Sequence, residues 1–221
     1  MNGLIVFDFD NTLVHSRIDF AGIRRDLIAL LREHGHPDAV DDRLERLSIG
    51  QIIDAGAEHD AAIYDEGWRI CLEYETAGMV AATVEADARS TLHQLRHDGY
   101  QLVVMTNNAR AATLAALDLF DLRSAFDLVL TRDEVPMKPD PGGILHAMAT
   151  FSAPAERTVM VGDSWMDGAS AARASAAFIG FRTPPTVLDE RSVPYWAVVQ
   201  QLSELGPVLA TPWPLAAPRV G

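Results

Sequence analysis

The stretch LIVFDFDNTL, residues 4–13, governs the interpretation of the whole chain. Its apolar beginning, residues 4–7, predicts a buried β-strand. Two carboxylates follow, Asp8 and Asp10, and residues two apart in an extended chain point to the same side. Carboxylates so close together repel each other unless a cation or a shared proton intervenes. The stretch therefore indicates either a site for an oxygen-seeking ion such as Mg²⁺ or a simple turn at the end of a strand.

The composition is typical of a soluble globular protein. The chain has 221 residues, of which 48% are hydrophobic and 22% are charged. Its net charge of −13 argues against nucleic acid and anionic membrane as partners. The single cysteine, Cys71, excludes an intrachain disulfide and favours a reducing compartment. We find no signal peptide or membrane-spanning stretch, so we expect a cytoplasmic location; the oligomeric state stays open.

From residue 84 onward, predicted strands alternate with predicted helices. Strands are expected at residues 101–105, 126–130, 158–161 and 177–181, and helices at residues 85–97, 110–119, 142–150 and 166–175. This alternation predicts an α/β fold with a doubly wound, Rossmann-like parallel sheet.

Residues 15–83 carry only helical patterns and form an insertion directly after the first strand. Helices are expected over residues 19–35, from residue 40 through 47, around residues 49–53, and over residues 60–78 with Asp60 as the cap. The core is then formed by residues 1–14 and 84–182. The remaining residues, 183–221, are expected to pack on the core as a C-terminal extension, with a short helix over residues 194–205 and a frayed end.

Polar residues follow the predicted strands at residues 8–12, 106–108 and 162–167, and Lys138 lies between a strand and a helix. In open α/β sheets the ligand site lies outside the carboxyl ends of the strands, so these groups are expected at one edge. Lys138 is the only lysine of the chain. Carboxylates, a hydroxyl and one lysine are the set that phosphoryl transfer uses.

Four stretches together resemble the haloacid dehalogenase (HAD) superfamily, specifically its phosphatase branch with a helical C1-type cap, which includes phosphoglycolate phosphatases. They are DFDNT at residues 8–12, MTN at 105–107, KPDP at 138–141 and GDSWMD at 162–167, in the order of the family. The resemblance covers about residues 1–182. One departure is Asn11, where phosphoglycolate phosphatases usually carry Asp.

The resemblance implies a role for each core residue. Asp8 would be the nucleophile and Asp10 the general acid and base. Thr106, the Asn107 amide and Lys138 would hold the phosphate, and Lys138 would also neutralise the nucleophile. The metal site for Mg²⁺ would comprise Asp8, Asp10, Asp163 and Asp167, with Asp10 contributing its backbone carbonyl.

In this family the helical cap closes over the site and selects the substrate. Arg17 and Arg24 are therefore expected to bind a carboxylate or a second phosphate of the substrate, although an arginine on a helix face is more often simply solvated.

The expected function is Mg²⁺-dependent hydrolysis of a small phosphate monoester through an aspartyl-phosphate intermediate, with a small phosphorylated metabolite as the partner. Asp10 favours ester hydrolysis over carbon–halogen cleavage, because a halide leaving group needs no proton. Two alternatives remain: a phosphosugar mutase of the same family, and a catalytically silent binding or regulatory protein on this fold.

Overall fold

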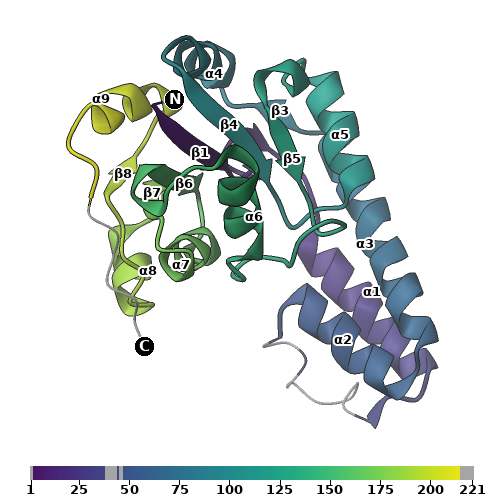
Figure 1. The fold of residues 1–221 in the computed structure, drawn as a ribbon. Coiled ribbons are helices and arrows are strands. Elements are labelled where there is room, and N and C mark those ends of the chain that lie inside the picture. Colours follow the sequence, from purple (N-terminus) through teal and green to yellow (C-terminus); the bar gives the residue numbers. More distant parts are fainter. Residues whose placement is uncertain (1, 38–43, 45–46, 215–221) are drawn as a thin grey trace. The chain divides into compact units, whose positions relative to one another are not determined.

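The computed structural model describes residues 2–37, 44 and 47–214 (Figure 1). The chain separates into two compact units. One comprises Met1–Ser16 and Thr83–Gly221, and the other comprises Arg17–Ala82. We call them the α/β unit and the helical unit and describe each by itself. In the part of the chain that the structure describes, no helix has the length and apolar character needed to cross a bilayer.

A six-stranded sheet forms the centre of the α/β unit. Across the sheet, the strands are β5 (Leu128–Leu130), β4 (Tyr100–Met105), β1 (Gly3–Phe7), β6 (Thr158–Gly162), β7 (Ala177–Phe181) and β8 (Ala197–Val199). All neighbouring strands pair in parallel. Every residue of β1 is buried between β4 and β6. A strand covered on both faces needs a continuous apolar run, which is the pattern that predicted it.

Helices cover both faces of this sheet, as the alternation predicted. They are α4 (Ala88–His97), α5 (Arg110–Leu119), α6 (Gly142–Phe151), α7 (Trp165–Arg173), α8 (Pro185–Glu190) and α9 (Leu205–Leu209), with 3-10 turns η3 (Arg123–Ala125), η4 (Ala155–Arg157) and η5 (Leu202–Glu204). The strand order grows outward from β1 in both directions, so right-handed connections put α4 and α5 on one face and α6 and α7 on the other. Figure 1 shows α6 and α7 packed over the strands.

Alternate residues of β1 face the two layers. Leu4 and Val6 belong to the apolar cluster that includes Ile144 of α6 and Ala171 of α7. Phe7, next in the alternation, meets Phe126 edge-on, with ring centroids 6.3 Å apart. Burial of both faces fixes the register of β1 and therefore the direction of the residues that follow it.

The helical unit contains α1 (Phe20–Glu33), α2 (Ile49–His59) and α3 (Ala62–Val80). Ser48 and Gln51 form a capping box at the start of α2. Asp60 was expected to cap α3, but Ala61 occupies that position, and the Asp60 carboxylate still accepts a hydrogen bond from the Ala62 amide at 2.9 Å. The helix expected over residues 40–47 lies mostly outside the described residues.

Two short strands, β2 (Val14–His15) and β3 (Thr83–Val84), pair antiparallel within the α/β unit. Strands of two residues are too short to give a periodic signal, so the sequence did not predict them. Glu85, directly after β3, is bound by Arg182 through two hydrogen bonds of 2.8 and 2.9 Å and by His15 at 2.6 Å. These contacts tie β2 and β3 to the segment that follows β7.

The prediction of a helix over residues 194–205 is wrong. Instead, Ala197–Val199 forms β8, which adds a sixth strand to the sheet, and η5 and α9 follow. The Trp196 amide donates to the Phe178 carbonyl at 2.7 Å and starts this pairing. Farther along, the ring centroids of Trp213 and Trp196 are 5.3 Å apart. The Arg157 guanidinium stacks over the Trp213 ring, with its carbon 4.6 Å from the ring centroid.

The ion pairs of Glu85 make part of the stability depend on pH. Burial alone would raise the pKa of the Glu85 carboxyl, but hydrogen bonds from Arg182 and His15 outweigh it and lower the pKa. Because the folded-state pKa lies below the unfolded value of about 4.3, this contribution is present above that pH and is lost as the pH falls through the folded-state pKa. We expect Glu85→Gln to lower the free energy of unfolding by about 1 kcal/mol near neutral pH.

Urea unfolding at neutral pH and at about pH 3 measures this difference, which should shrink at the lower pH. Glu156→Gln is the matched control, since Glu156 is exposed and lies on η4. A Glu85→Gln effect of the same size at both pH values would contradict the assignment.

Candidate active site

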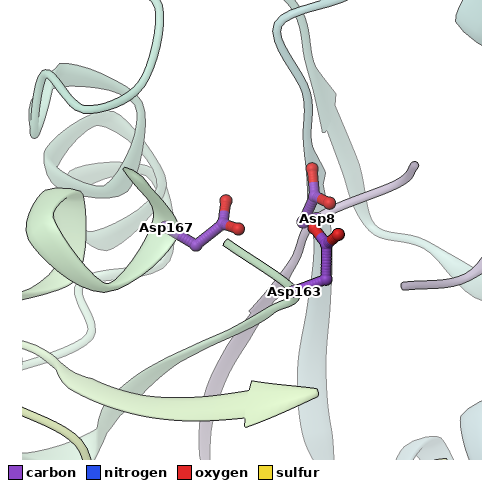
Figure 2. A group of neighbouring side chains, drawn as sticks. All are labelled: Asp8, Asp163 and Asp167. Atoms are coloured by element: carbon purple, nitrogen blue, oxygen red, sulfur yellow. The ribbon is translucent and has the colours of Figure 1, made fainter. Parts of the chain in front are cut away.

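The carboxylates lie at the edge of the sheet where the parallel strands end. Asp8 follows β1, Asp163 follows β6, and Asp167 lies in the first turn of α7. Figure 2 shows the three carboxylates coming together from these elements. One oxygen of each lies within 4.8 Å of the others. The sequence analysis predicted that these residues lie close together, because neighbouring parallel strands end at the same edge of the sheet.

Lys138, on the loop before α6, lies among these carboxylates. Its Nζ is 2.5 Å from Asp8 Oδ1 and 2.6 Å from Asp167 Oδ1, and all three side chains are buried. Burial alone would lower the pKa of the lysine, but Asp167 and Asp8 raise it above its usual value. The ammonium group therefore stays charged and holds the two carboxylates on either side of it.

Asp167 is fixed by the start of its own helix. Ser164, the N-cap of α7, donates to Asp167 Oδ2 from its amide at 3.0 Å and from its hydroxyl at 2.6 Å. The space for this carboxylate exists because residue 162 is a glycine: a Cβ there would lie 2.4 Å from Asp167 Cγ. The glycine at the end of β6 is thus a packing requirement of the site.

The turn after β1 orients Asp8. The Asp8 amide donates to the Val161 carbonyl at 2.9 Å, which extends the pairing with β6, and the Thr12 hydroxyl donates to Asp8 Oδ2 at 3.2 Å. Asn11 has a φ of 55°. Asn and Asp both tolerate this left-handed conformation, so the departure at residue 11 leaves the turn intact.

Asp10 is held by a residue to which the sequence analysis gave no role. The side-chain amide of Asn108, on the loop after β4, donates to Asp10 Oδ2 at 2.5 Å. Burial raises the pKa of the Asp10 carboxyl even though the Ser16 and Asn108 side chains stabilise its charged form. Thr106, at the end of β4, is buried, and its hydroxyl oxygen accepts from the Asn108 amide at 3.2 Å.

The Asn107 side chain forms two hydrogen bonds with the backbone of Lys138. Its Oδ1 accepts from the Lys138 amide at 2.8 Å, and its Nδ2 donates to the Lys138 carbonyl at 3.1 Å. The Asn107 carbonyl in turn accepts from Arg132 at 3.1 Å. The sequence predicted a contribution from the Asn107 backbone amide; the side-chain contact joins two loops distant in sequence and had no local signal.

The negative charge of the site exceeds its positive charge. Four carboxyl groups, those of Asp8, Asp10, Asp163 and Asp167, surround one ammonium group. Burial, reinforced by the neighbouring carboxylates of Asp167, Asp163 and Asp10, raises the pKa of Asp8 well above its usual range against the attraction of Lys138. Burial reinforced by Asp167 raises the pKa of Asp163 to about 6. Clustered hard oxygen donors with uncompensated negative charge fit a divalent cation such as Mg²⁺.

Arg17 and Arg24 belong to the helical unit. The Arg17 side chain is exposed, and Arg24 is half-buried and donates from Nη1 to the Leu44 carbonyl at 2.9 Å within that unit. Their predicted contact with the substrate stays a prediction.

Comparisons with known proteins agree with this geometry. The family model of the haloacid dehalogenase-like hydrolases matches residues 3–175. A phosphoglycolate phosphatase of Cereibacter sphaeroides is 30% identical over 199 residues, which cover 82% of this chain and 87% of the relative. The probable phosphatase IndB of Dickeya dadantii is 34% identical over 194 residues, 81% of each chain.

Solved structures share the fold. A HAD-superfamily hydrolase of subfamily IA from Geobacter sulfurreducens superimposes with a TM-score of 0.64 at 22% identity, over 94% of this chain and all of the other. A protein assigned as a β-phosphoglucomutase from Thermotoga maritima gives a TM-score of 0.62 at 19% identity, over 94% of this chain and 98% of the other.

The chain therefore belongs to the haloacid dehalogenase-like hydrolase family. Within it, the protein is an enzyme of the phosphatase branch.

The glycine at residue 162 gives a test of this packing. In Gly162→Ala the new Cβ would force the Asp167 carboxylate aside and release one of the two groups that hold Lys138. We expect phosphate release to fall by about 10- to 100-fold, because small displacements of reacting groups are costly. Steady-state phosphate release measures it, and thermal unfolding reports whether the fold is retained.

Gly180→Ala is the matched control. Gly180 pairs with Gly162 across β6 and β7, but the atoms nearest to a Cβ there are 3.3 Å away. Full activity of Gly162→Ala would show that the position of Asp167 is unimportant.

Proposed function

We propose that the protein hydrolyses small phosphate monoesters with Mg²⁺ through an aspartyl phosphate on Asp8. The observation that carries this proposal is the buried group in which Lys138 lies between Asp8 and Asp167, with Asp163 beside them. Such a group combines a nucleophile with fixed positive charge and a set of cation ligands.

Asp8 begins the reaction by attacking phosphorus while the bond from phosphorus to the ester oxygen breaks. The Asp10 carboxyl donates its proton to that ester oxygen, and the alcohol leaves. A water molecule then attacks the aspartyl phosphate and gives its proton to Asp10. The bond from phosphorus to the Asp8 oxygen breaks, which releases inorganic phosphate and restores both residues.

Other residues bind the phosphoryl group during these steps. Lys138 offers positive charge to both Asp8 and the phosphoryl oxygens, and its position depends on Asp167 and on the Asn107 side chain. The Thr106 hydroxyl and the Asn107 amide donate to the phosphoryl oxygens. Fixed donors of this kind stabilise the transition state because they need no reorganisation.

Asp8, Asp163 and the Asp10 backbone carbonyl would hold Mg²⁺, which, when bound, neutralises charge on the phosphoryl oxygens. Asp167 already accepts hydrogen bonds on both oxygens, from Lys138 and from Ser164, and adds negative charge to the site.

The substrate class follows from the relatives. Several curated relatives are phosphoglycolate phosphatases, so 2-phosphoglycolate is the first ester to examine. Arg17 and Arg24 remain the candidates to bind its carboxylate, since arginine pairs with carboxylates through two hydrogen bonds.

Replacement of the nucleophile and removal of the metal test this mechanism. We expect Asp8→Asn to lower phosphate release by several orders of magnitude, because the amide cannot attack phosphorus. Release by the wild-type protein from p-nitrophenyl phosphate and 2-phosphoglycolate should stop with a chelator and return with Mg²⁺. A phosphosugar mutase would instead release little phosphate while it converts a sugar phosphate.

Asp189→Asn is the matched control, the same chemical change at an exposed position on α8. Thermal unfolding gives a second measurement: Mg²⁺ should raise the midpoint of the wild-type protein, and less so that of Asp163→Asn. If the wild-type protein hydrolyses no ester of a broad metabolite panel in Mg²⁺, the proposed function is wrong.

A further inference from the structure

The side chain of Asn108 contacts the carboxyl group that the proposed mechanism uses for proton transfer. Its Nδ2 donates to Asp10 Oδ2, although the two residues lie 98 positions apart in the chain. Asn108 follows β4 and Asp10 follows β1, and these strands are neighbours in the sheet. The asparagine side chain is buried, and Asp10 is partly buried, so this hydrogen bond is only partly accessible to water.

The backbone of Asn108 is itself fixed. Its amide donates to Thr106 Oγ1 at 3.2 Å, and its carbonyl accepts from the Arg132 amide at 3.3 Å. The neighbouring side chain, that of Asn107, binds the Lys138 backbone. Two consecutive asparagines therefore serve two different groups: Asn107 reaches Lys138, and Asn108 reaches Asp10.

The hydrogen bond leaves the two oxygens of Asp10 unequal. Oδ2 accepts from Asn108, whereas no hydrogen bond of ordinary geometry reaches the buried Oδ1 among the described residues, although the Ser16 side chain also lies close enough to stabilise the charged carboxyl group. A buried polar atom without a partner is costly, and a catalytic role is one reason for a protein to keep such an atom. An anchored Oδ2 also restricts rotation of the carboxyl group, so that Oδ1 keeps one direction.

We propose that Asn108 is a positioning residue that holds Asp10 so that Oδ1 is the atom that gives the proton to the ester oxygen and later accepts one from water. This inference rests on the proposed function and adds the residue that sets the geometry of the proton transfer. Asn108 acts on leaving-group protonation, and Asn107, through Lys138, acts on the phosphoryl group.

The two roles predict different responses to the leaving group. A p-nitrophenolate leaves without much help from an acid, whereas an alkoxide leaves only when it is protonated. Loss of Asn108 should therefore slow phosphorylation of Asp8 by an alkyl phosphate much more than by p-nitrophenyl phosphate. Loss of Asn107 should slow both alike, because both esters present the same phosphoryl group.

The experiment compares single-turnover rates of alcohol release from p-nitrophenyl phosphate and from the alkyl phosphate that the wild-type protein hydrolyses fastest. In Asn108→Ala we expect the alkyl rate to fall about 10- to 100-fold more than the aryl rate. Inhibition by inorganic phosphate should stay at its wild-type strength. Asn107→Ala, the same change one residue earlier, is the matched control and should weaken that inhibition.

Equal losses with both esters in Asn108→Ala would overturn the proposal. If that variant does not fold, Asn108→Leu keeps about the size of the side chain, removes the donor without adding a charge and carries the same expectation. The variant Asp10→Asn distinguishes a failure of the acid role of Asp10 from a failure of the positioning role of Asn108. An equal loss with both esters in Asp10→Asn refutes the acid role of Asp10, and the inference falls with it. A leaving-group contrast in Asp10→Asn that is missing from both Asn108 variants refutes the inference alone.

Discussion

The interaction on which the site depends is the ammonium group of Lys138 shared by the carboxylates of Asp8 and Asp167. Removing three charged groups from water is costly, and their mutual attraction offsets that cost only when the geometry is fixed. Three segments must therefore keep fixed positions relative to one another: the end of β1, the loop before α6 and the first turn of α7. The central position of β1, paired on both sides, provides the fixed frame.

Many of the surrounding contacts serve this one arrangement. Gly162 leaves room for Asp167, Ser164 binds its second oxygen, and Asn107 holds the backbone of Lys138 from a neighbouring strand end. The site still keeps more negative than positive charge. A protein selected only for stability would not gather four carboxyl groups around one lysine, because like charges in a buried site oppose folding. The excess negative charge is what a divalent cation needs.

Most of the core was predictable from the sequence because its signals are local. The run at residues 4–7 is apolar since both faces of β1 are covered, and Asp8, Asp163 and Asp167 follow strands that end at one edge. The contacts of Asn107 and Asn108 were not predictable, because each asparagine binds a residue of another loop. The β8 strand was missed because Pro194 suggested the first turn of a helix, whereas pairing with β7 gives residues 197–199 their strand conformation.

The central place of β1 also bears on how the protein forms during synthesis. Leu4 pairs with Gln101 on one side and with Thr158 on the other, so β1 has no partner until β4 is made and is not paired on both sides until β6 follows. The contacts of the sheet are long-range, which slows folding, whereas the intervening α1, α2 and α3 contact one another within a short span of sequence. Until β4 and β6 are made, the strand that precedes Asp8 and Asp10 is an unpaired apolar segment of the kind that chaperones protect.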